Sequence, residues 1–257
     1  MQDYSKLKGI NPEKFLSGND YSLFLSLALI NNDLGDLVYL QGLHARSVKK
    51  IKYPISAEHG RKTGRDIYIF RLALSHLFNI LEFFYKRIKD IEKDNLLNKI
   101  INEDISTDEK LFWDLIITLS KSYKDFGKDK LAVVGINPEL LRVISLSEAA
   151  RNDVTFHYHG TPRHLKLGFE SAFKNNSLPN TKYAFVTEIG SVAEDRRYYI
   201  DISLEKFLEK EAGLEESIYK TESLMVDFIA NLNRVIYKIL FEFHKTLGFE
   251  DLNEKES

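Results

Sequence analysis

The chain contains no cysteine among its 257 residues, and only five prolines and 13 glycines. The absence of cysteine excludes disulfide scaffolds, cysteine-ligated zinc, iron–sulfur clusters and thiol catalysis. The few prolines and glycines leave long stretches without a residue that breaks a helix. A fold made of long helices is therefore open to this chain, and a disulfide-stapled fold is not.

An excess of charge of one sign is also missing, because 36 Lys and Arg stand against 38 Asp and Glu. A net charge of −2 creates no general attraction for nucleic acid, so any such contact must come from a local basic patch. The sequence has no P-loop, no G-x-G-x-x-G, no H-E-x-x-H and no G-x-S-x-G motif. We expect no cofactor.

Long hydrophobic runs are absent as well. No stretch reaches the roughly 18 consecutive apolar residues of a membrane span, because charged and polar residues interrupt the most apolar part, Ile67 to Ile91. The first residues show no apolar segment of a secretory signal. These features predict a soluble, cytoplasmic protein that makes no contact with a membrane.

What the sequence has in abundance is apolar residues at helical spacing. One helix is predicted to end near Arg46, before a polar segment with Pro54 and Gly60. Its apolar face is predicted from the spacing of Tyr21, Phe24, Leu25, Ala28, Leu29, Asn32 and Asp36. Further long helices are predicted from Arg65 to Lys93, from Asn137-Pro138 toward Tyr158, and from Leu214 to Leu247. The helices Arg65–Lys93 and Leu214–Leu247 each carry an apolar stripe suited to a bundle core. A shorter helix is predicted to start at a cap, Ser106 or Thr107, and to run to Tyr123.

Residues Tyr183–Ile189 and Arg197–Ile202 are β-branched and aromatic, and they flank a segment that begins with Gly190. This pattern predicts a β hairpin. The chain as a whole is therefore predicted to be all-α: a single domain over 1–257, an elaborated helix bundle with four long helices. Insertions are expected near 94–136 and 160–212, the second of which carries the small β hairpin.

Three of the seven histidines fall within the stretch Arg151–His164. His157 and His159 have no carboxylate pair at a supporting spacing, so we predict no metal site there. Arg151-Asn152, four further residues and His157 resemble the signature of the HEPN domains (higher eukaryotes and prokaryotes nucleotide-binding), which is Arg, four to six residues, then His. The run Asn31-Asn32-Asp33-Leu34 also resembles the first helix of some members.

The resemblance implies a metal-independent endoribonuclease, with a possible role in prokaryotic defence or as a toxin with an antitoxin partner protein. An imidazole that titrates near neutrality suits His157 for activating a ribose 2′-hydroxyl. The forked guanidinium of Arg151 suits the charge that develops on the phosphate, and Asn152 can orient either group. Tyr158, His159 and Arg163 are the expected contacts to the RNA or nucleotide.

On one straight helix Arg151 and His157 would stand roughly 9 Å apart along the axis and about 120° out of phase. Either the helix ends between them or two chains combine their motifs, and the resemblance implies a homodimer. The alternatives are a non-catalytic RNA- or nucleotide-binding module and a structural interaction subunit. Arg151 can simply pair with Glu148 on a helix. Asp33, Asp36, His76 and Glu82 can be solvated or interface groups rather than parts of a site.

Overall fold

The computed structural model describes residues 22–47, 57–125, 135–145, 167, 170, 188–189, 197–198 and 218–246. This part of the chain is all-α, apart from two paired strands of two residues each. The principal helices in chain order are α2 (Ser22–Ser47), α3 (Ala57–Lys93), α4 (Asn95–Lys99), α5 (Thr107–Lys121), α6 (Pro138–Ser145) and α10 (Ile218–Thr246).

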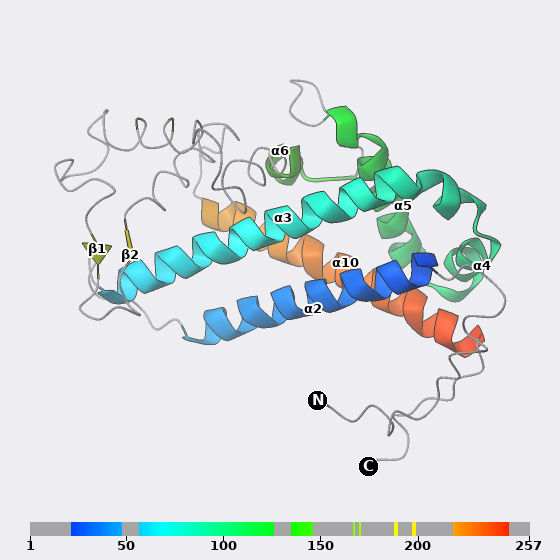
Figure 1. The fold of residues 1–257 in the computed structure, drawn as a ribbon, viewed down its shortest axis with the longest axis horizontal. Coiled ribbons are helices and arrows are strands. Elements are labelled where there is room, and N and C mark those ends of the chain that lie inside the picture. The colour runs from blue at the N-terminus through cyan, green and yellow to red at the C-terminus, as the bar shows by residue number, and fades with distance from the viewer. Residues whose placement is uncertain are drawn as a thin grey trace, which may run out of the picture.

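The three longest of these helices, α2, α3 and α10, pack along one another (Figure 1). α2 and α3 are antiparallel, because Arg87 donates a hydrogen bond of 3.1 Å to Ser22 while Asp33 lies against His76. α2 and α10 are antiparallel as well, since the rings of Phe24 and Phe243 stack with centroids 3.9 Å apart. In the view of Figure 1, α10 passes behind α2 and α3, and it contacts both helices.

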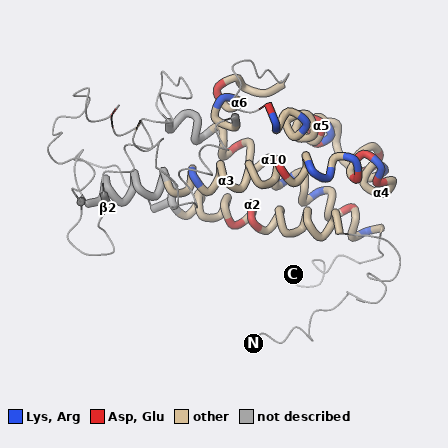
Figure 2. Tube along the Cα trace, turned by 45° about the horizontal axis from the view of Figure 1, so that its top comes forward, with Lys and Arg blue, Asp and Glu red and all other residues tan. Residues whose placement is uncertain are grey.

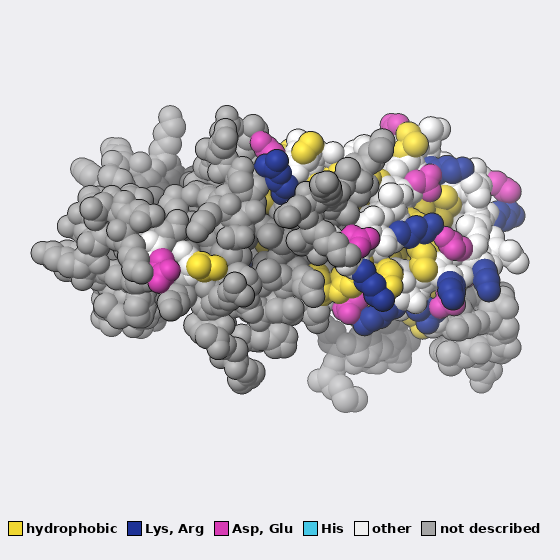
Figure 3. All heavy atoms as spheres, turned by 90° about the horizontal axis from the view of Figure 1, so that it is seen from above, with side chains coloured by type: hydrophobic (Ala, Val, Ile, Leu, Met, Phe, Trp, Pro, Cys, Tyr) yellow, Lys and Arg dark blue, Asp and Glu magenta, His cyan; other side chains and the backbone are white. Residues whose placement is uncertain are grey.

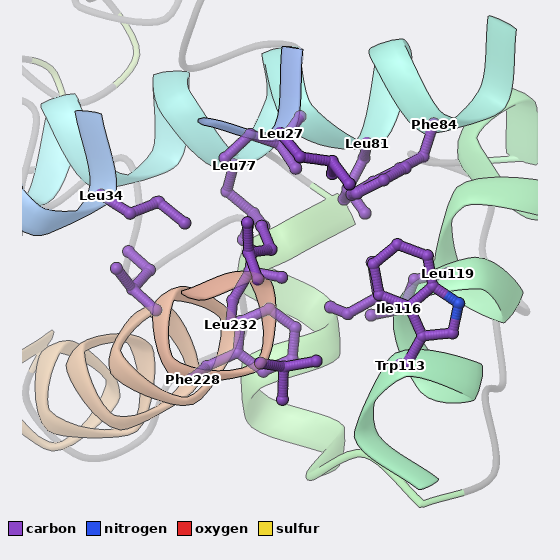
Figure 4. Packing of buried hydrophobic residues seen from close by; sticks show 14 of the residues in the cluster. Leu27, Leu34, Leu77, Leu81, Phe84, Trp113, Ile116, Leu119, Phe228 and Leu232 are labelled. Atoms are coloured by element: carbon purple, nitrogen blue, oxygen red, sulfur yellow. The ribbon is translucent and has the colours of Figure 1, made fainter. Parts of the chain in front are cut away.

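The core of the described residues lies between these helices and α5. Figure 4 shows Leu27 and Leu34 of α2 opposite Leu77 and Leu81 of α3 and close to Leu232 of α10. At one end Trp113 of α5 packs edge-on against Phe84 of α3, with ring centroids 5.4 Å apart. The apolar stripes predicted for the helices near Arg65–Lys93 and Leu214–Leu247 are the ones that α3 and α10 bury here.

The face predicted for α2 is wrong. The error concerns part of that face: Leu25 and Leu29 are exposed, whereas Phe24 is buried and Ala28 packs against the core. Leu27 and Leu34, which are not members of the predicted face, are fully buried. α2 carries apolar side chains around most of its circumference, so more than one set of positions satisfies helical spacing. Contacts with α3 and α10 decide which set is buried.

The boundaries show where local signals were sufficient. Asn137 caps α6 as predicted, with its Oδ1 accepting a 2.8 Å hydrogen bond from the Glu139 N–H, and Pro138 is the first helical residue. Ser106 caps α5 in a reciprocal capping box with Glu109. α3 differs from prediction: it begins at Ala57 rather than near Arg65, so Gly60 lies inside the helix. A single glycine weakens a helix without ending it.

Between α3 and α5 the chain turns in a compact helical segment. Asp94 interrupts α3 and caps α4, its Oδ1 accepting a 2.9 Å hydrogen bond from the Leu97 N–H. A π-helical turn, η2 (Ile100–Asp104), continues α4. Leu97 and Ile100 are fully buried in the bundle core. An ion pair of 2.8 Å between Lys121 and Glu92 ties the end of α5 back to α3.

The two short strands are β1 (Glu188–Ile189) and β2 (Arg197–Tyr198). They pair antiparallel, with Glu188 opposite Tyr198 and Ile189 opposite Arg197, and β2 contacts α3. The residues between them lie outside the described part of the chain, so the full predicted hairpin stays a prediction. The same holds for the helix from Asn137, which is described only as far as Ser145.

Candidate functional site

The site residues predicted from the sequence lie outside the described part of the chain. They are Arg151, Asn152, His157, Tyr158, His159 and Arg163. The structure therefore neither brings these side chains together nor separates them, and their roles stay predictions.

The nearest preceding element is α6, which is anchored firmly in the bundle. Leu140, Leu141 and Ile144 are buried, and α6 packs against both α3 and α10. The Asn137 cap satisfies orphan N–H groups at the start of this helix. The last described residue of this well-packed helix, Ser145, precedes the predicted motif by six positions in the sequence.

Among the described residues, the structure brings together two side chains that were not predicted to form a pair. Asp33 of α2 and His76 of α3 approach across the seam between these helices, with Oδ2 3.9 Å from Nδ1. Both side chains are partly exposed. The distance is too long for a hydrogen bond but short enough for an ion pair when the imidazole is protonated.

The carboxylate of Asp33 and the imidazole of His76 set an acidic and a basic group side by side on this surface. Asp36 follows Asp33 by three residues on the same exposed side of α2, which adds a second carboxylate to this surface. Glu82 is not part of this group, because it forms a 2.8 Å ion pair with Lys86 on its own helix. The Asp33–His76 pair depends on the antiparallel register of α2 and α3. Because the spacing of residues along the chain does not specify this register, the sequence contains no signal for the pair.

Polar groups also line the seam between α2 and α10. The Oδ1 atoms of Asn31 and Asn233 are buried without a hydrogen-bond partner in the structure. A side chain added at Gly35 would meet Asn233, whose Nδ2 lies 4.0 Å from the position of the missing Cβ. Buried amides without partners cost stability, so this seam is held mainly by the apolar residues around it.

Glu242 of α10 is a buried carboxylate with two lysines beside it. Lys238 and Lys245 donate hydrogen bonds of 2.8 Å and 3.0 Å to its Oε1. Burial opposes ionisation of Glu242, but these hydrogen bonds outweigh it and hold the pKa of the carboxyl below its ordinary value. The hydrogen bond to Glu242 in turn raises the pKa of Lys238. This cluster is satisfied within one helix and therefore stabilises α10 rather than forming a reactive site.

The described surface offers no concentrated basic region. Figure 2 shows Lys and Arg alternating with Asp and Glu along α4 and α5, and Figure 3 shows the same mixture on the face seen from above. Of the basic residues in and after the predicted motif, Arg151, Arg163, Lys166 and Arg196 lie outside the described residues, and Arg197 is described only as part of the strand β2.

Within the ranges that the structure describes, no group of three or more His, Asp or Glu side chains is arranged to hold a metal ion. In the same ranges, Ser22–Leu43 of α2 is long and apolar enough to cross a membrane, a test that core helices of soluble proteins also pass. The predicted cytoplasmic location stays a prediction. Searches of protein-family models, of curated proteins and of solved structures find no match to this chain.

Proposed function

We propose that the chain is a HEPN-like, metal-independent endoribonuclease. The observation that carries the proposal is the motif Arg151-Asn152, four residues and His157, in a chain whose described part is all-α. The proposal includes the finer fold, in which α2, α3, α10 and a helix continuing from α6 toward Tyr158 are the four long helices. It also includes the β hairpin around β1 and β2.

In the proposed reaction His157 removes the proton from a ribose 2′-hydroxyl. The 2′-oxygen then attacks the adjacent phosphorus, and the bond from phosphorus to the 5′-oxygen breaks. The imidazolium returns the proton to the departing 5′-oxygen, which leaves a 2′,3′-cyclic phosphate and a 5′-hydroxyl. Arg151 stabilises the charge of the pentavalent phosphorus, and Asn152 orients the phosphate.

A homodimer belongs to this proposal. His157 follows Arg151 by six positions, which sets them on different sides of a straight helix. A cleft between two chains would allow the arginine of one and the histidine of the other to meet at one phosphate. Tyr158, His159 and Arg163 would then contact the RNA beside the reacting bond.

The experiment is incubation of the purified protein with total RNA in the presence of a chelator. We expect new fragments that end in 2′,3′-cyclic phosphate. His157→Ala should lower the rate by roughly 10²–10⁴-fold, the usual contribution of a general base. Arg151→Lys should also lose RNA cleavage, because a lysine ammonium does not reproduce the forked contact of the guanidinium with two phosphate oxygens.

His159→Ala is the matched control, for which we expect a smaller loss. Circular dichroism should show that all three variants keep the helical content of the wild type. Full activity of His157→Ala, or activity that chelator abolishes and magnesium restores, would contradict the mechanism.

A second candidate function is that of an interaction module, and one observation favours it. Several large apolar side chains of α2 are exposed along the helix, as is typical of a protein-binding surface. Inactivity of the wild type on every RNA tested would favour the two non-catalytic alternatives, an RNA- or nucleotide-binding module and an interaction subunit, over the ribonuclease.

A further inference from the structure

The outer face of α2 consists of seven exposed residues between positions 25 and 43: Leu25, Leu29, Asp33, Asp36, Tyr39, Leu40 and Leu43. Its large apolar members are Leu25 (54% exposed), Leu29 (63%), Tyr39 (64%), Leu40 (43%) and Leu43 (44%). Single exposed apolar side chains are ordinary, but several on one surface mark a place where another molecule binds.

These residues share one side of the helix. At about 100° per residue they fall within a stripe of roughly 120°, which is the width of a buried face on an amphipathic helix. The opposite side of α2 is already used, because Leu23, Leu27, Leu34 and Leu37 fill the bundle core against α3 and α10. α2 thus has two apolar faces, and within the described part of the chain the inner one packs in the core while the outer one is exposed.

Apolar and acidic residues occupy separate parts of the outer face along the helix. Leu25 and Leu29 form an apolar end, the exposed carboxylates of Asp33 and Asp36 occupy the middle, and Tyr39, Leu40 and Leu43 form a second apolar end. Figure 2 shows the acidic middle on α2. The segment Ser22–Leu43 has no Lys or Arg to neutralise these carboxylates, and His76 beside Asp33 is the described neighbour with which one of them pairs.

We propose that the outer face of α2 binds an amphipathic helix of a partner protein whose apolar stripe is interrupted in its middle by Lys or Arg. The apolar ends would supply most of the buried area, as in helices that bind along a hydrophobic surface. The central cations would pair with Asp36, which would otherwise be buried as an uncompensated carboxylate, and with Asp33, which has His76 as its described neighbour. This inference does not rest on the proposed ribonuclease activity.

Charge complementarity decides among the occupants. A second copy of the chain, bound about a two-fold axis at the centre of this face, would bring four carboxylates together, and like charges in close contact oppose association. A bilayer would have to bury the same carboxylates and would offer negatively charged headgroups to them. A basic helix is the occupant that satisfies both the apolar ends and the acidic middle.

The probe is a labelled synthetic helix of about six turns, with Leu at positions that match the two apolar ends and Lys at two central positions of the same stripe. A matched peptide carries Glu at those two positions. Binding is measured by fluorescence anisotropy at low and high salt. We expect the Lys peptide to bind at least about tenfold more tightly than the Glu peptide, a difference that shrinks in salt.

Two protein variants test the assignment. Asp33→Lys combined with Asp36→Lys should reverse the preference between the peptides, whereas Asp114→Lys, an exposed substitution on α5, should leave it unchanged. Leu29→Gln should lower the binding affinity for both peptides without altering the melting temperature of the protein. Circular dichroism establishes that each variant is folded.

Three results would overturn the proposal. The first is a folded wild type that binds neither peptide, or both equally. The second is self-association that Asp33→Asn combined with Asp36→Asn strengthens, because this would identify a second copy as the occupant. The third is cosedimentation with phosphatidylcholine–phosphatidylserine vesicles that Leu29→Gln abolishes, because this would identify a bilayer.

Discussion

α2 and α10 are both long helices of one bundle, yet they use their apolar residues differently. α10 has one apolar stripe, and its members Met225, Phe228, Leu232 and Ile239 are buried. α2 has apolar residues on two sides, and it buries Leu27 while Leu29, two positions later, is exposed. Helical periodicity identifies the buried face of a helix only when the opposite face is polar.

The largest effect should separate the two faces of α2. Leu27→Ala removes a fully buried side chain and should lower the free energy of unfolding by about 2–5 kcal/mol. Leu29→Ala should change it by less than about 0.5 kcal/mol, because that side chain already contacts solvent. Urea denaturation followed by circular dichroism measures both values. Equal losses would mean that the two sides of α2 are buried alike.

An intermediate effect should distinguish the carboxylates of the two helices. Glu242 of α10 is buried between two lysines, whereas Asp36 of α2 is exposed. Glu242→Gln should lower the free energy of unfolding by about 1–2 kcal/mol at pH 7, since Lys238 and Lys245 exchange a charged acceptor for a neutral amide oxygen. Asp36→Asn is the control and should have almost no effect.

The pH dependence of that difference follows from the lowered pKa of Glu242. The pKa of this carboxyl is lower in the folded protein than its ordinary value of 4.5. The carboxyl therefore contributes its full stabilisation at pH values above 4.5. The advantage of the wild type over Glu242→Gln should therefore be complete near neutrality and disappear as the pH falls through the lowered pKa. An advantage that persists at the acidic end would contradict this account of the cluster.

The smallest effect should come from the pair that joins α2 to α3. Asp33 and His76 are partly exposed and 3.9 Å apart, so their coupling should not exceed about 0.5 kcal/mol. A double-mutant cycle with Asp33→Asn and His76→Ala, measured by denaturation at neutral and mildly acidic pH, gives this coupling. A value well above 1 kcal/mol would show that the pair fixes the register of α2 against α3.

The sequence by itself determined the features that depend on neighbours along the chain. The all-α class, the buried stripes of α3 and α10, the capping box at Ser106 and the start of α6 at Asn137-Pro138 each follow from spacing or from a side chain next to its own backbone. The site at Arg151–His157 is also proposed from a local sequence motif. It stays a prediction because those residues lie outside the described ranges.

Tertiary structure alone decided which face of α2 is buried, that α3 continues back through Gly60 to Ala57, and that Asp33 lies beside His76. The buried face of α2 and the Asp33–His76 pair depend on contacts between segments far apart in the chain, whose energies are not encoded in the local spacing of apolar residues. For a helix with two apolar faces, the free energy of burial is similar for either one. The helices that pack against it make the choice, and the face left over remains exposed to bind another molecule.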